Sequence, residues 1–94
     1  MHDEGFDWSD VKARGNLKKH GVTFEVARLV FDDPSSLDEI DDRENYGEDR
    51  FVITGRANGR MLTVTYTERE GRIRIISARK ATRREQDDYF SQDF

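Results

Sequence analysis

The chain has 94 residues, enough for one domain over residues 1–94 and too few for a second hydrophobic core. Only 34% of the residues are hydrophobic and 38% are charged, but ten aromatic residues and several periodic apolar segments predict a folded domain with a thin core. Cysteine is absent, which excludes disulfide bonds and thiolate metal sites. No apolar run approaches the roughly 18–20 residues of a membrane span, and the acidic N-terminus lacks the basic start of a signal peptide, so we expect a cytoplasmic protein.

The formal net charge of −4 hides an uneven distribution. Residues 1–49 contain fourteen Asp or Glu against six Lys or Arg, whereas residues 50–84 contain two against ten. A local basic surface can bind phosphate groups even in an acidic protein. The basic half of the chain is therefore the expected binding region.

A short strand and a capped helix are expected at the N-terminal end. Phe6 and Trp8 predict the strand or its edge. Ser9 is typical of a helix N-cap and Gly21 of a helix end, so the first helix should run to about His20.

A second helix and an edge strand should follow. Thr23 is typical of an N-cap, and the helix over 24–33 should end before Pro34. Its apolar residues recur at helical spacing and should face a sheet. The acidic segment after it predicts an edge strand at about 37–40.

Three further strands are joined by two tight turns. Asn58-Gly59 is the strongest two-residue hairpin signal, and Glu70-Gly71 can form a second such turn. These turns place Ile53 opposite Val64 and Tyr66 opposite Ile75.

Strand alternation then divides the side chains between two faces. The helix-side face should form the core and consists of Phe51, Ile53, Leu62, Val64, Tyr66, Ile73 and Ile75, with Glu68 and Arg79 near its edges. The other face should be open and consists of Val52, Thr54, Arg56, Met61, Thr63, Thr65, Thr67, Arg74, Ile76, Ala78 and Lys80. A face made of threonines and cations around few apolar residues is typical of a binding surface.

The last element is a C-terminal helix. Thr82 and Glu85 form a capping box, and Tyr89 and Phe90 lie in the helix that it opens. The first turn of this helix carries the basic pair 83–84. Positive charge is mildly unfavourable at a helix N-terminus, which suggests a role for these arginines other than helix stability.

Arginines dominate the candidate binding residues. Guanidinium groups bind phosphate through paired N–H donors, so we expect this surface to bind single-stranded RNA or to pair with the acids of residues 32–49. The basic residues of the sheet and the following helix are Arg50, Arg56, Arg69, Arg74, Arg79, Lys80, Arg83 and Arg84. Lys19 and His20 are either favoured cations at a helix C-terminus or groups for acid–base chemistry. No metal-ligand motif is present, and we expect no metal and no cofactor.

Nearly the whole chain resembles the BrnT family of type II toxin–antitoxin systems. The most specific features are the N-terminal pattern of Trp8, His20, Gly21, Val22 and Phe24, and the segment RIISARKA from Arg74 to Ala81. The resemblance implies a compact α+β domain with a RelE-like fold: an antiparallel sheet, two N-terminal helices packed on one face, and a C-terminal helix. It also implies a metal-independent endoribonuclease that inhibits translation.

The chemistry implied by the resemblance is attack of a 2′-hydroxyl on the adjacent phosphate. We expect Arg74 and Arg79 to stabilise the developing charge. Lys19, His20 and Glu68 are alternatives for the two proton transfers. The residues expected to hold RNA are Arg50, Arg56, Lys80, Arg83 and Arg84.

The resemblance further implies a BrnA-type antitoxin as partner, with a ribbon-helix-helix domain that dimerises and contacts operator DNA. The acidic residues 86–94 stand where a basic helix is expected, and they either lower RNA affinity or contact the antitoxin. The alternative function is a catalytically inactive toxin-like module that acts as co-repressor with the antitoxin. A protein that binds DNA by itself is disfavoured because the arginines lie mainly on strands.

Overall fold

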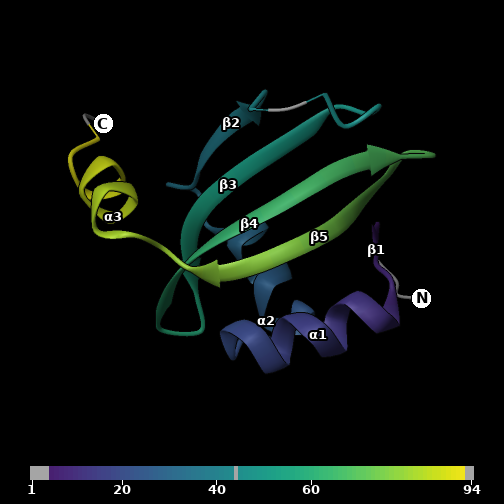
Figure 1. Cartoon of the computed structure of the whole chain (residues 1–94). Helices are drawn as coiled ribbons and strands as arrows, with labels where there is room; N and C mark the ends of the chain where they lie inside the picture. Colours follow the sequence, from purple (N-terminus) through teal and green to yellow (C-terminus); the bar gives the residue numbers. More distant parts are fainter. Residues whose placement is uncertain (1–4, 44, 93–94) are drawn as a thin grey trace.

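A computed structural model describes residues 5–43 and 45–92 of the chain. In chain order the elements are β1 (Phe6–Asp7), α1 (Asp10–His20), α2 (Phe24–Ala27), the 3₁₀ helix η1 (Arg28–Asp32), β2 (Leu37–Asp41), β3 (Arg50–Ala57), β4 (Arg60–Arg69), β5 (Arg72–Lys80) and α3 (Arg83–Phe90). The strands form one sheet in the order β1-β5-β4-β3-β2 (Figure 1). The α+β class and the element order expected from the sequence are confirmed.

The sheet is mixed, not antiparallel as expected. β1 pairs in parallel with β5, with Phe6 opposite Ile73 and Asp7 opposite Arg74, whereas the other pairs are antiparallel. A parallel pair needs a long connection between its strands, and the elements from α1 to β4 supply it between β1 and β5.

The predicted helix caps are confirmed. The Ser9 side chain accepts from the backbone N–H of Lys12, and Thr23 accepts from Val26. α1 ends at Gly21, whose φ of 70° lies in the left-handed region that favours glycine. The second helix differs from the expectation, because after one α-helical turn it continues as the 3₁₀ helix η1.

We expected the two N-terminal helices to pack together on one face of the sheet, and they do not. α2 and η1 cover one face of the sheet, whereas α1 runs alongside β5, next to β1 (Figure 1). The buried side chain of Asn16 fixes this position: its Nδ2 donates to the carbonyls of Ala78 (2.8 Å) and Val22 (3.0 Å), and its Oδ1 accepts from the Ala78 N–H (3.0 Å). Asn16 thus takes the place of a neighbouring strand where β1 has ended.

The two predicted hairpins have the expected register. Asn58 and Gly59 both have positive φ, as do Glu70 and Gly71, which matches the turns preferred between antiparallel strands. Ile53 lies opposite Val64, and Tyr66 opposite Ile75, as predicted. The helix-side face forms the core through Ile53, Leu62, Val64, Tyr66 and Ile75, which are all buried beside Trp8, Phe24, Ala27 and Val30.

A β-bulge at Ile76 overturns the face assignments beyond it. Thr65 lies opposite Ser77, whereas its neighbour Tyr66 lies opposite Ile75, so Ile76 is an extra residue on β5. One inserted residue moves every later side chain to the other face.

The face assignments of three residues change as a result. Ala78 was expected on the open face and is instead buried in the core, opposite Val64. Arg79 was expected on the helix side and instead lies on the open face, opposite Thr63. Lys80 was expected on the open face and lies opposite Leu62, on the helix side.

α3 covers one end of the face that was expected to be open. Its capping box between Thr82 and Glu85 is present as predicted. The Tyr89 hydroxyl and the backbone N–H of Arg56 both donate to one carboxylate oxygen of Asp33, each at 2.7 Å. Burial raises the pKa of Asp33, but these bonds and one from Ser35 lower it more, so the net pKa is below its usual value. Asp33 therefore joins α3 to β3.

Within the part of the chain that the structure describes, no helix is both long and apolar enough to cross a membrane.

Candidate functional site

A polar groove of about 440 Å³ crosses the open face of the sheet. It extends from β2 and the residues after it, over the middle of β3, β4 and β5, to the C-terminal end of α1 and the start of α3. Its lining consists of His20, Glu39, Ile40, Asp41, Asp42, Arg43, Val52, Thr65, Ser77, Arg79 and Glu85. Two residues of the predicted site, His20 and Arg79, therefore lie at one groove.

Arg79 is held in the groove by a bidentate ion pair with Glu85. Its Nη1 donates to Glu85 Oε1 (2.8 Å) and its Nη2 to Oε2 (3.0 Å), and Nη1 also donates to the carbonyl of Lys80 (3.2 Å). These contacts leave the Nε–H and the second Nη2–H, which form a parallel pair of donors. No acceptor among the described residues contacts that pair, and 37% of the Arg79 side chain is exposed. Arg79 can therefore receive an oxyanion while it remains bound to Glu85.

Glu85 has two further partners that fix its carboxylate. Oε1 also accepts from the hydroxyl of Thr63 (2.9 Å) and from the backbone N–H of Thr82 (2.8 Å). Because the Thr63 proton is used in this way, the hydroxyl of Thr54, 2.9 Å away, donates to Thr63. The hydrogen bonds from Arg79, then those from Thr82 and Thr63, outweigh burial and lower the pKa of Glu85 to about 2.

Glu85 is the site residue that sequence reasoning missed. The sequence explained it completely as the third helical residue of a capping box. The only available signal was the helix-cap glutamate six residues after Arg79, but the predicted face of Arg79 pointed away from it.

The depressed pKa of Glu85 predicts that the stability of the fold depends on pH. A carboxyl with a depressed pKa stabilises the fold above its unfolded pKa, near 4.5, and loses that contribution as the pH falls toward its folded pKa of about 2. Glu85→Gln keeps a capping side chain but loses the charge, so we expect a lower melting temperature than wild type at pH 7. The difference should shrink between pH 4.5 and pH 2, measured by thermal denaturation.

Asp88→Asn is the matched control for this experiment. Asp88 lies in the same helix and is exposed, and its carboxylate has no partner among the described residues. Its melting temperature should follow the wild type at every pH. A difference for Glu85→Gln that stays constant across the pH range would contradict the role of the ion pair.

The opposite end of the groove is acidic. Arg43 donates to both carboxylate oxygens of Asp41, through Nε at 2.8 Å and Nη2 at 2.9 Å, and the Tyr46 hydroxyl lies 3.4 Å from the same group. The Arg43 hydrogen bond outweighs burial and lowers the pKa of Asp41. With Glu39 and Asp42 also in the lining, this end of the groove repels phosphate and suits a cationic partner.

Arg74 lies in a separate hollow of about 140 Å³ at the far end of β5. Its Nη1 donates to Asp7 (2.8 Å), the residue opposite it on β1. Lys12, Arg50 and Arg69 also line this hollow. The structure therefore separates Arg74 from Arg79, which the sequence analysis had grouped for one role.

The remaining predicted residues lie outside the groove lining. Lys19 is exposed on α1, and Glu68 is exposed near the second hairpin, opposite Ile73. The Arg56 guanidinium lies over the ring of Phe90, with 5.2 Å to the ring centroid. The other predicted RNA contacts are exposed at the end of β5 and on α3: Lys80, Arg83 and Arg84.

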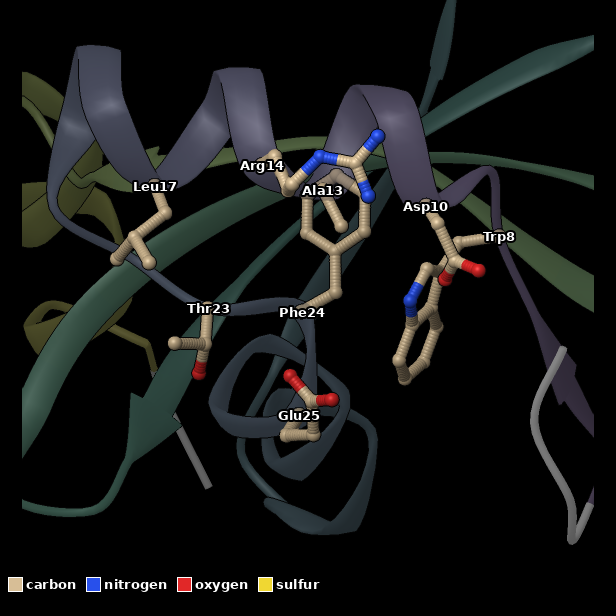
Figure 2. A pocket seen from close by; sticks show the side chains of 8 residues that line it. All are labelled: Trp8, Asp10, Ala13, Arg14, Leu17, Thr23, Phe24 and Glu25. Carbon is tan, nitrogen blue, oxygen red and sulfur yellow. The ribbon is translucent and has the colours of Figure 1, made fainter.

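A third hollow, of about 250 Å³, lies between α1 and α2 on the helix side (Figure 2). The rings of Trp8 and Phe24 meet there edge to face, with centroids 5.8 Å apart, and both residues are buried. Val22, from the same sequence pattern, is fully buried and accepts a hydrogen bond from Asn16. The N-terminal pattern thus specifies mainly the packing of α1 on α2, and His20 is its member at the groove.

No residue is assigned as a metal ligand. Among residues 5–43 and 45–92, His, Asp and Glu side chains do not gather in groups of three that could hold a metal ion.

Comparison with known proteins identifies the family. No curated protein matches the chain. A family model described as the ribonuclease toxin BrnT of type II toxin–antitoxin systems matches residues 8–85, which include α1, the whole of β2 to β5 and the groove residues His20, Arg79 and Glu85. The chain therefore belongs to the BrnT family of ribonuclease toxins of type II toxin–antitoxin systems.

Proposed function

We propose that this protein is a RelE-like, metal-independent endoribonuclease that inhibits translation by cleaving RNA in the groove on the open face. The observation that supports this best is the orientation of the Arg79 guanidinium group and its unused donors. Its guanidinium is oriented by Glu85 at the groove and retains a parallel pair of N–H donors. Such a pair matches two oxygens of a phosphate group.

The proposed reaction is attack of an RNA 2′-oxygen on the adjacent phosphorus. A bond forms between the 2′-oxygen and phosphorus, the bond from phosphorus to the 5′-oxygen breaks, and the products are a 2′,3′-cyclic phosphate and a 5′-hydroxyl. A base removes the 2′-proton and an acid protonates the leaving oxygen. Arg79 is the group proposed to stabilise the negative charge on the phosphorane.

His20 is our candidate for one of the two proton transfers. Among Lys19, His20 and Glu68, it is the one that lines the groove with Arg79. An imidazole ring can accept or donate a proton through its nitrogens, which suits His20 to either transfer. Arg83 and Arg84, exposed on α3, are proposed to hold the RNA strand outside the groove, with Arg56 and Lys80.

The proposed partner is a BrnA-type antitoxin with a ribbon-helix-helix domain, and any contact with operator DNA would occur through it. Membership of a type II toxin–antitoxin family supports an antitoxin partner. The acidic end of the groove at Glu39, Asp41 and Asp42 gives a cationic segment of such a partner a place to bind.

The proposal is tested with the antitoxin-free protein and a single-stranded RNA. We expect cleavage products that end in a 2′,3′-cyclic phosphate, and we expect the same rate in excess EDTA because no metal takes part. Loss of cleavage in EDTA would contradict metal independence. Products with a 5′-phosphate would contradict attack by the 2′-oxygen.

A catalytically inactive co-repressor is the second candidate. It is favoured by the groove lining, where four carboxylates surround the two arginines Arg43 and Arg79, each of which is already in an ion pair. This alternative predicts no RNA cleavage and a stable complex with the antitoxin. Gel filtration of the mixed proteins together with the cleavage assay separates the two candidates.

A further inference from the structure

The hollow around Arg74 is cationic. Four basic side chains line it: Lys12 from α1, Arg50 from β3, Arg69 from β4 and Arg74 from β5. Two carboxylates contact them. Glu48 is shared by Arg50 and Arg69 at 3.3 Å each, and Asp7 pairs with Arg74 at 2.8 Å.

Only some of the N–H donors of these basic side chains are bound to carboxylates. Glu48 engages one nitrogen of each arginine that it contacts, so both guanidinium groups keep further N–H donors. The Lys12 ammonium has no carboxylate partner among residues 5–43 and 45–92. The hollow therefore has unused donors for an anion, whereas four of the eleven residues that line the groove at Arg79 are carboxylates.

The two sites lie on one face and one strand. Arg74 lies opposite Thr67, and Arg79 opposite Thr63, so both side chains belong to the open face of the sheet. Arg79 lies five positions after Arg74, which at about 3.3 Å per residue corresponds to about 16 Å along β5. A strand of RNA with one phosphate at Arg79 can follow β5 and place another phosphate in the hollow.

We propose that the hollow lined by Lys12, Arg50, Arg69 and Arg74 is a phosphate subsite, which binds the RNA strand away from the cleaved bond and supplies a large part of the affinity. This inference rests on the proposed ribonuclease function. In this proposal the RNA is cleaved in the groove and is bound electrostatically in the hollow, because the carboxylates around Arg79 weaken phosphate binding in the groove. RNA fits this arrangement better than an acidic peptide because its phosphates continue from the groove to the hollow.

The test compares two double variants in RNA binding. Lys12→Gln with Arg69→Gln removes two charges from the hollow. Lys18→Gln with Arg60→Gln is the matched control, since it removes one lysine from α1 and one arginine from the other end of β4, and neither residue lines the groove or the hollow. The probe is a fluorescent 2′-O-methyl RNA of about 12 nucleotides, which cannot be cleaved and is within single-strand site sizes.

Each lost phosphate contact on a single strand should lower the slope of log K against log salt by about 0.7. At about 0.1 M salt this corresponds to a roughly fivefold weaker affinity per contact, so the hollow variant should bind about 25-fold more weakly, with a slope reduced by about 1.4. The control variant should stay within about twofold of wild type. In cleavage assays the hollow variant should raise KM and leave kcat unchanged.

Three results would overturn the subsite. Equal affinity and slope for the hollow and control variants would do so, and the ribonuclease proposal would stand if wild type still cleaves RNA. Weakened binding of purified antitoxin by the hollow variant, with unchanged RNA binding, would show that the hollow takes an acidic peptide instead. A wild-type protein that neither binds nor cleaves RNA would overturn both proposals.

Discussion

Arg79→Ala is expected to lower kcat for RNA cleavage by about 10²–10³ with little change in KM. Removal of one preorganised donor that meets developing charge typically has an effect of this size. The substitution deletes the unused donor pair of Arg79 and leaves the Glu85 carboxylate without its ion-pair partner. Single-turnover cleavage of a short RNA gives the rate of the chemical step.

Two companion variants show whether the geometry of Arg79 is required. Arg79→Lys keeps the charge but cannot bind Glu85 and a phosphate through parallel donors, so it should recover only a small part of the rate. Arg14→Ala removes an exposed arginine of α1 that lines the helix-side hollow and not the groove, and it should cleave like wild type. Full activity in Arg79→Ala, with melting temperatures showing that the variants are folded, would contradict the assignment.

Asn16→Ala is expected to lower the free energy of unfolding by about 3–5 kcal/mol. The substitution leaves the Val22 carbonyl and both backbone groups of Ala78 without their partner in a buried position. An unsatisfied buried group costs about 1–3 kcal/mol, and the total stability of a domain of this size is about 5–14 kcal/mol. Urea denaturation at equilibrium measures the loss.

Lys18→Ala is the control for the same helix, because Lys18 is exposed and an exposed substitution should change stability by no more than about 0.5 kcal/mol. A loss of under about 1 kcal/mol for Asn16→Ala would show that α1 is not held to β5 by this side chain. Because α1 also carries His20, a loosened helix should reduce RNA cleavage as well.

Much of the fold was predictable because its signals are local. The turns at Asn58-Gly59 and Glu70-Gly71 specify two hairpins through the backbone conformations that they favour. The caps at Ser9 and Thr23 satisfy nearby N–H groups and so locate the helix starts. Apolar alternation identified the core face of β3, of β4 and of β5 as far as Ile75.

The candidate site was predictable in composition but not in arrangement. The sequence alone determined that cations concentrate in residues 50–84, and the family pattern includes His20 and Arg79. The partner of Arg79 could not be inferred, because a capping box accounts for Glu85 without any contact to the sheet. The separation of Arg74 from Arg79 into two hollows also depends on side chains from β1, α1 and the loop before β3.

The fold class, the hairpins, the helix caps and the charge of the basic half follow from the sequence alone, since each depends on residues close together in the chain. Which side chains meet depends on the tertiary structure. The bulge at Ile76 moved Arg79 to the open face, and Asn16 placed α1 on the edge of β5. A bulge and a contact at a strand edge both depend on hydrogen bonds between segments that are distant in the chain. The alternation of residues within one strand contains no information about those bonds.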